Sequence, residues 1–175
     1  MKKCTSHFIK IDNELLHEFK EFIIRVNQYL SSQIKDTRYH ASNTKGQSKI
    51  KHLTIEDDKW RLTCEQNREN APFTDRVVIY YLNQKIWTMS REGGLTPAAE
   101  SFKVNLQRFF YKIAENYDSK RPWSGPRKMV DDETDLIYES TYSGSDEAFT
   151  IYERCYYGCC GGSVLWHAKC SGGFI

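Results

Sequence analysis

The sequence predicts an α+β fold in which one unit, an amphipathic helix followed by an antiparallel β-meander, occurs twice, the two copies being related by a pseudo-twofold axis. Apolar residues recur at helical spacing in two stretches, polar and apolar residues alternate in others, and the two halves match at constant offsets. A chain of 175 residues can bury most of its surface in one core. We therefore expect a single domain over residues 1–175, with repeat units at approximately 12–95 and 96–175.

The first helix is predicted over residues 13–33, with Asp12 or Asn13 as its N-cap. Its apolar residues recur at the spacing that places them on one side of a helix. They are Leu15, Phe19, Phe22, Ile23, Val26 and Leu30. Polar residues dominate the stretch 31–48 that follows, and we expect it to form a mobile surface loop.

The second helix is predicted over residues 97–117, because Thr96 can cap it and Pro97 suits the first helical position. Its apolar residues are Phe102, Leu106, Phe109, Phe110, Ile113 and Tyr117. Each lies 87 positions after a member of the first set. This constant offset indicates an internal duplication.

Alternating stretches predict four strands in each unit. They cover residues 49–55, 59–66, 76–82 and 85–91 in the first unit, and residues 127–130, 135–142, 150–158 and 163–170 in the second. Residues 60–82 align without a gap on residues 136–158. The strands therefore support the duplication independently of the helices.

The register of the last hairpin in each unit decides which face of the sheet each side chain occupies. We pair Tyr80 with Trp87, and Tyr156 with Trp166. The helix-covered face then holds Val78, Tyr80, Trp87, Met89, Tyr156, Trp166 and Ala168.

The opposite face then carries aromatic and charged side chains, a combination that can stack on a ligand and orient it. We predict these ligand-binding residues: Tyr81, Glu139, Glu153, Tyr157, His167 and Lys169. The alternative is an ordinary solvated sheet face with cross-strand charge pairs.

No catalytic residue is predicted. The five histidines are scattered, and no nucleophile motif or phosphate-binding glycine loop accompanies them. Glu139 and Glu153 could form a carboxylate pair on the ligand face, or they could be exposed structural carboxylates.

A group of cysteines near the C-terminus has the composition of a zinc site. It comprises Cys155, Cys159, Cys160, His167 and Cys170. The register places Cys170 roughly 10 Å along the sheet from Cys155, too far for both to bind one ion. We therefore expect no metal and no cofactor.

Composition excludes several classes of partner. The 25 basic and 23 acidic residues leave a net charge of only +2, so nucleic acid is not expected as a partner. A small basic group could contact phosphates, but a solvated charge run is the commoner explanation; it comprises Arg38, Lys45, Lys49 and Lys51. No stretch approaches the roughly 20 apolar residues of a membrane span. Since the N-terminus lacks the apolar run of a signal peptide, we expect a cytoplasmic protein with reduced cysteines.

The second unit carries a series of motifs. Residues 121–126 read Arg-Pro-Trp-Ser-Gly-Pro, and later motifs are Tyr138-x-Ser-x-Tyr142-x-Gly144, Phe149-x-x-x-Glu153, Trp166 and Gly172-Gly173. With these motifs the chain resembles an uncharacterised bacterial family known only as a domain of unknown function. The resemblance covers roughly residues 60–95 and 100–175.

The family pattern is Phe-x-Gly-x-Glu, and this chain departs from it. Asp75 and Ile151 replace the glycine, and Val77 replaces the glutamate in the first unit. The resemblance thus implies a site with that glutamate only in the second unit. Family members sometimes follow a helix-turn-helix domain, which implies a sensing or binding module that would report through a separate partner in this chain.

The leading functional prediction is a non-catalytic binding module that captures a small ligand on the polar aromatic sheet face or at the junction of the two repeats. The first alternative is a protein-binding inhibitor, antitoxin or immunity-type protein, which would use the same face or the stretch 31–48. The second is an uncharacterised hydrolase or transferase, which would need a carboxylate or histidine with a strongly shifted pKa.

Overall fold

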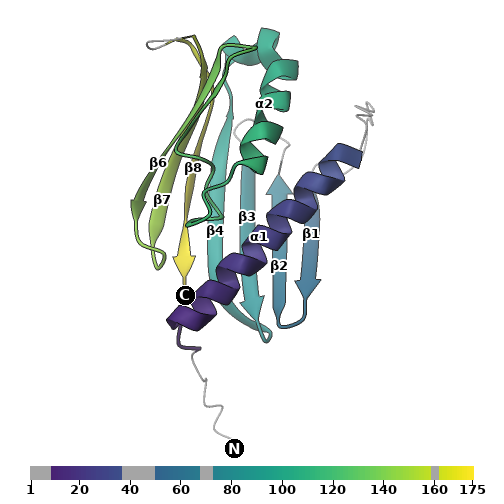
Figure 1. Ribbon diagram of the computed structural model, residues 1–175, viewed down its shortest axis with the longest axis vertical. Helices are drawn as coiled ribbons and strands as arrows, with labels where there is room; N and C mark the ends of the chain where they lie inside the picture. Colours follow the sequence, from purple (N-terminus) through teal and green to yellow (C-terminus); the bar gives the residue numbers. More distant parts are fainter. Residues whose placement is uncertain (1–8, 37–49, 68–72, 159–161) are drawn as a thin grey trace, which may run out of the picture.

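One antiparallel sheet of eight strands, with two helices on one of its faces, makes up the fold (Figure 1). The computed structural model describes residues 9–36, 50–67, 73–158 and 162–175. In chain order the elements are α1 (Asn13–Asp36), β1 (Ile50–Asp57), β2 (Trp60–Asn67), β3 (Phe73–Tyr81), β4 (Gln84–Leu95), η1 (Pro97–Phe102), α2 (Lys103–Glu115), β5 (Lys128–Asp131), β6 (Leu136–Gly144), β7 (Phe149–Tyr157) and β8 (Val164–Phe174). The strands lie side by side in the order β1-β2-β3-β4-β8-β7-β6-β5. The α+β prediction is confirmed.

The elements match the predicted ones apart from their boundaries. α1 continues to Asp36, so the first part of residues 31–48 is helical rather than a loop, and residues 37–49 lie outside the described part of the chain. Residues 97–102 form the 3-10 helix η1, with the N–H of Ala99 bonded to the carbonyl of Thr96 at 3.0 Å, and α2 begins only at Lys103. Neither helix, as far as its residues are described, is long and apolar enough to cross a membrane.

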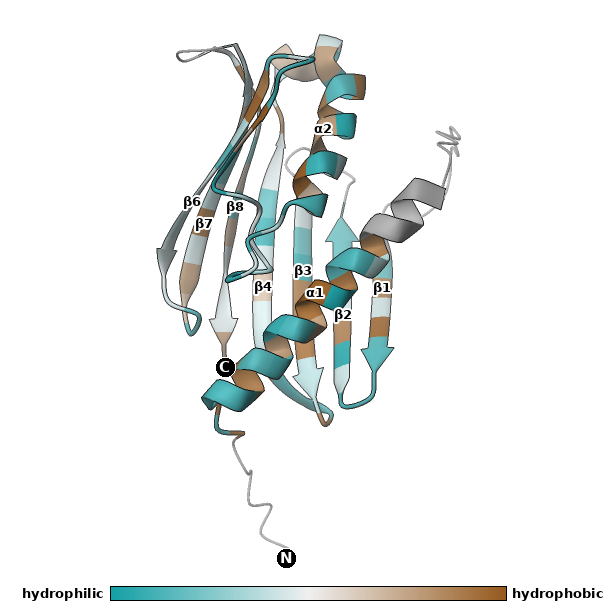
Figure 2. Ribbon diagram, viewed as in Figure 1, coloured by the Kyte–Doolittle hydropathy of each residue, from teal (hydrophilic) through white to brown (hydrophobic). Residues whose placement is uncertain are grey.

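Each helix packs its apolar side on a separate cluster of sheet residues (Figure 2). Phe19 of α1 is fully buried, with ring centroids 5.9 Å from Trp60 and 5.6 Å from Trp87. Phe109 of α2 is buried in the second cluster beside Leu136. Burying one such ring stabilises the fold by about 1.5–3 kcal/mol, so the helices are fixed on this face mainly by apolar contacts.

The connection formed by residues 118–126 packs against α1 and the sheet. Its Pro122 carbonyl accepts a hydrogen bond of 2.7 Å from the side-chain amide of Asn27 on α1. The ring of Trp123 stacks on Phe149 of β7 at 5.8 Å between centroids. This connection therefore covers the helix-facing side of the sheet where α1 and α2 leave it open.

The register of the β3–β4 hairpin contains a β-bulge. Ile79 pairs with Trp87, but the next residue, Tyr80, pairs with Lys85, so Ile86 is an extra residue on β4. A bulge sets two residues opposite one and turns the strands relative to each other. The predicted pairing of Tyr80 with Trp87 is therefore wrong, and Ile79, which is fully buried, takes the place predicted for Tyr80.

The β7–β8 hairpin has a bulge at the corresponding point. Cys155 pairs with Trp166 and Tyr156 with Val164, which leaves Leu165 as the extra residue. Cys155, which is fully buried beneath α2, takes the place predicted for Tyr156. The faces predicted for β4 and β8 are right, whereas those predicted for β3 and β7 are reversed.

An ion pair joins α2 to the edge of the sheet. The Lys112 ammonium lies 2.6 Å from a carboxylate oxygen of Asp131, and this bond holds the pKa of Asp131 below its ordinary value. A carboxyl with a lowered folded-state pKa contributes stability above its unfolded pKa, and the contribution is lost as the pH falls through the folded value.

We expect Lys112→Met to lower the free energy of unfolding at pH 7, because the largely buried Asp131 loses its ammonium partner and keeps only the hydrogen bond from Thr134. The difference from the unmodified protein should vanish once Asp131 is protonated in both. Urea unfolding at a series of acidic pH values checks this. Lys103→Met, which removes a more exposed pair with Glu100, is the control and should cost almost nothing at any pH. An equal loss in both variants would contradict the role of Asp131.

Candidate functional site

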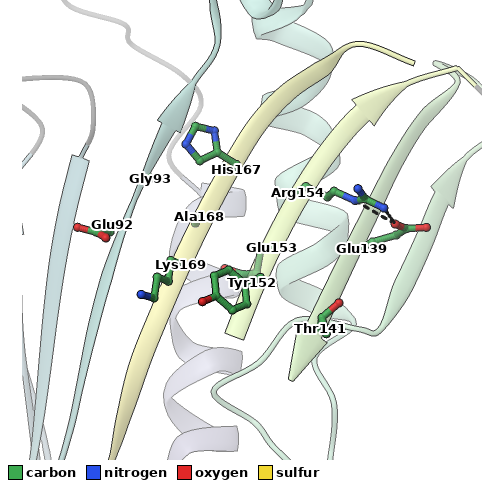
Figure 3. A pocket seen from close by; sticks show the side chains of 10 residues that line it. All are labelled: Glu92, Gly93, Glu139, Thr141, Tyr152, Glu153, Arg154, His167, Ala168 and Lys169. Carbon is green, nitrogen blue, oxygen red and sulfur yellow. Dashed lines mark hydrogen bonds and ion pairs between the residues drawn. The ribbon is translucent and has the colours of Figure 1, made fainter. Parts of the chain in front are cut away.

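The face of the sheet opposite the helices holds a hollow of about 680 Å³ (Figure 3). It extends over β4, β8, β7 and β6. Its lining residues are Glu92, Gly93, Glu139, Thr141, Tyr152, Glu153, Arg154, His167, Ala168 and Lys169. Alternation along each strand means that only some of them direct side chains into it. Glu153 and Ala168 contribute backbone, since their side chains point to the helices.

Glu139 is held at one side of the hollow by three hydrogen bonds from two neighbours. Arg154 donates two hydrogen bonds of 2.7 and 3.1 Å to one oxygen, and the Tyr156 hydroxyl donates one of 2.9 Å to the other. The bonds from Arg154, followed by that from Tyr156, lower the pKa of Glu139. Glu139 therefore stays ionised at neutral pH, and the positive charge of Arg154 is already neutralised.

The other side of the hollow carries charges without such partners. Glu92 of β4 and Lys169 of β8 are opposite each other in the register, yet they form no ion pair in the described part of the chain. The Lys169 ammonium instead lies 5.8 Å from the ring centre of Tyr152, whose exposed fraction is 54%. His167 is exposed on the same face. These four side chains are available to a ligand.

Three of the six predicted ligand-binding residues lie on this face. They are Glu139, His167 and Lys169. Tyr81 instead packs beside α1, 4.7 Å from the ring of Trp60. Tyr157 packs on Phe102, at 4.8 Å between ring centroids.

The sixth predicted residue, Glu153, is also on the helix-covered face, where only 8% of it is exposed. The cause of all three errors is the pair of bulges, which reverses β3 and β7 relative to the predicted register. The same reversal brings Tyr152 and Arg154, which the prediction missed, onto the outer face. The adjacent apolar pairs Ile86-Trp87 and Leu165-Trp166, in otherwise alternating strands, are the sequence signal that could have revealed the bulges.

Glu153 belongs to a polar cluster beneath the helices. One of its oxygens is 2.9 Å from the Arg91 guanidinium, the other accepts a hydrogen bond from the Tyr138 hydroxyl, and Cys170 lies at 3.4 Å. The guanidinium is in turn 5.2 Å from the ring centre of Trp166. The cluster therefore links β4, β6, β7 and β8 through side chains.

Burial decides the protonation of this cluster. It raises the pKa of Tyr138 far above its ordinary value and raises the pKa of Cys170 to about 12, and the neighbouring Glu153 adds to both shifts. Both groups therefore stay protonated near neutral pH. Gly125 packs against the same polar cluster, because a Cβ atom at this position would overlap the Tyr138 hydroxyl. Three motif positions, Gly125, Tyr138 and Glu153, thus meet in a cluster suited to holding strands together.

No three His, Cys, Asp or Glu side chains come close enough to hold a metal ion within residues 9–36, 50–67, 73–158 and 162–175. Cys155 is buried under α2, and burial raises the pKa of its thiol to about 12. Cys159 and Cys160 lie outside the described residues.

The family model described as a domain of unknown function, DUF5680, matches residues 68–175. That match includes β3 to β8 and therefore all strands that line the hollow. No curated protein matches the chain, and no solved structure does.

Removing the Glu153 carboxylate leaves the Arg91 charge partly buried without its partner. We expect Glu153→Ala to lower the free energy of unfolding by about 3 kcal/mol. Glu139→Ala, the same change on the opposite face of the neighbouring strand, should cost about 1 kcal/mol or less. Denaturant unfolding of both variants tests the contrast. The double variant Arg91→Met/Glu153→Leu should be more stable than Glu153→Ala, since it removes both charges. An equal loss of unfolding free energy in Glu153→Ala and Glu139→Ala would show that the cluster does not hold the strands together.

Proposed function

Since the chain belongs to the DUF5680 family, whose description assigns no activity, we propose a function from its own geometry: it is a non-catalytic binding module that captures a small ligand on the outer face of the sheet. The observation that carries the proposal is the hollow of about 680 Å³ on that face. Its volume falls within the range of about 300–1,000 Å³ that small-molecule sites occupy.

We also propose that the hollow lies at the junction of two repeats. The two bulges support this, because Ile79 and Cys155, where the register shifts, are 76 residues apart, the offset that aligns residues 60–82 with residues 136–158. Glu92 comes from the first unit, and the remaining lining side chains come from the second. The proposed binding face then lies at the junction between the two repeats.

The protonation states favour binding over catalysis. A general acid or base works best with a pKa near the operating pH. Among the residues that line the hollow, Glu139 has a pKa below its ordinary value, whereas the raised pKa values of Tyr138, Cys155 and Cys170 belong to the helix-covered face. Glu139 therefore holds its charge, which suits recognition.

The side chains without partners indicate the class of ligand. The exposed ring of Tyr152 offers a stacking surface, and Lys169 beside it offers a positive charge. A small molecule with a flat ring and an acidic group would satisfy both. The described cysteines Cys155 and Cys170 are free thiols, which suits the reducing bacterial cytoplasm as the location of such a module.

A protein partner is the second candidate, and the composition of the same face favours it. Tyrosine and arginine are the residue types that protein interfaces favour, and this face carries Tyr80, Tyr152, Tyr156, Arg61 and Arg154. An inhibitor or immunity-type protein could use these residues without any small molecule.

Native mass spectrometry of the protein purified gently from its source cells tests the proposal. We expect a small mass bound to the chain. Tyr152→Ala/Lys169→Ala should reduce its occupancy about tenfold or more, because it removes the stacking ring and the positive charge.

The matched control is Tyr80→Ala/Lys85→Ala, the same pair of changes on β3 and β4, away from the hollow. It should retain the small mass. Loss of the mass in both variants, or retention in both, would place the ligand elsewhere, and a protein-sized addition in place of the small mass would favour the second candidate.

A further inference from the structure

The two edges of the sheet differ in length. β5 has four residues, whereas β1 has eight and ends the sheet on the other side (Figure 1). No described strand pairs with the outer side of β1. A long edge strand presents backbone N–H and C=O groups that can pair with another strand.

The β1–β2 turn shows which groups point outward. Asp57 pairs with Trp60 across a two-residue turn. The residues that flank such a turn bond to each other, and bonded and non-bonded pairs then alternate along the strands. The backbone groups that face away from β2 therefore belong to His52, Thr54 and Glu56.

These residues make β1 complementary to itself. In an antiparallel pairing of two copies centred on Thr54, His52 of one copy lies opposite Glu56 of the other, and Leu53 lies opposite Ile55. The basic side chain meets the acidic one on the outer face, where both are exposed. The two aliphatic side chains, each only partly buried by α1 and its surroundings, meet on the helix face. Side chains that can hydrogen-bond to each other and aliphatic pairs are cross-strand combinations that stabilise a ladder.

We propose that β1 is a homodimerisation edge: a second copy of this chain pairs with it antiparallel about Thr54, so that two eight-stranded sheets become one. The symmetry is twofold with the axis perpendicular to the sheet, as in isologous dimers. The outer faces of the two copies then lie on the same side of the joined sheet. If the proposed ligand site is correct, each dimer presents two sites on one surface, but the dimer itself does not depend on a ligand.

Sedimentation velocity of the full chain over a range of concentrations tests the dimer. We expect a reversible monomer–dimer equilibrium, with about micromolar affinity for an edge of this size. Thr54→Pro should abolish the dimer, because it removes an outward N–H, and leave the monomer folded, because that N–H does not bond to β2. A wild-type chain that stays monomeric throughout would overturn the proposal.

Substitutions that change the charges at positions 52 and 56 test the register of the two β1 strands without introducing proline. Glu56→Lys should weaken the dimer about tenfold, since symmetry applies each cross-strand pair twice. His52→Glu/Glu56→Lys places a glutamate opposite the new lysine and should recover most of the affinity. Asp132→Lys, at the turn near the opposite edge, is the control and should leave the affinity unchanged. Failure of the double variant to recover would reject this register.

Disulfide cross-linking tests whether the twofold axis of the dimer passes beside Thr54. Bonded antiparallel pairs have Cα atoms about 5.5 Å apart, which suits a disulfide. With Cys4, Cys159 and Cys160 replaced by serine, Thr54→Cys should form a covalent dimer on mild oxidation, and Thr141→Cys, on β6 of the same face, should not. Equal cross-linking at both positions would show random collision instead of a defined edge.

Discussion

The pairing of β4 with β8, from Trp87 opposite Phe174 to Leu95 opposite Trp166, joins two four-stranded halves into one sheet. At its centre Arg91 of β4 reaches past β8 to Glu153 of β7. The sheet face that the two helices cover depends on this β4–β8 joint. The outer hollow depends on it too, because residues from both sides of the joint line the hollow.

The Arg91–Glu153 pair stabilises this joint mainly by specifying its register. A buried ion pair gains little net free energy, because both charges lose water, but breaking it leaves a charge without compensation. A slip of one residue between β4 and β8 would turn Arg91 to the outer face and leave Glu153 beneath the helices. The ion pair beneath the helices therefore favours the one register that also forms the outer hollow.

The parts of the fold that follow from local periodicity could be predicted from the sequence. Both helices, the strands and the division into an apolar and a polar face are local features, and they are present. The bulges are set by how two strands fit, so the prediction placed Tyr81, Glu153 and Tyr157 on the wrong face. Glu153 could not be assigned to the interior from its neighbours in sequence, because its partner Arg91 is far away in the chain and a glutamate alone is expected to be exposed.

The central claim is that the β4–β8 joint makes the chain one cooperative unit, and native-state amide hydrogen exchange tests it most directly. The account predicts that amides of β4 and β8 exchange only through global unfolding, with the same free energy of opening as the slowest amides of β3 and β7. Exchange from β4 and β8 at a clearly lower free energy, with the two halves opening separately, would contradict it.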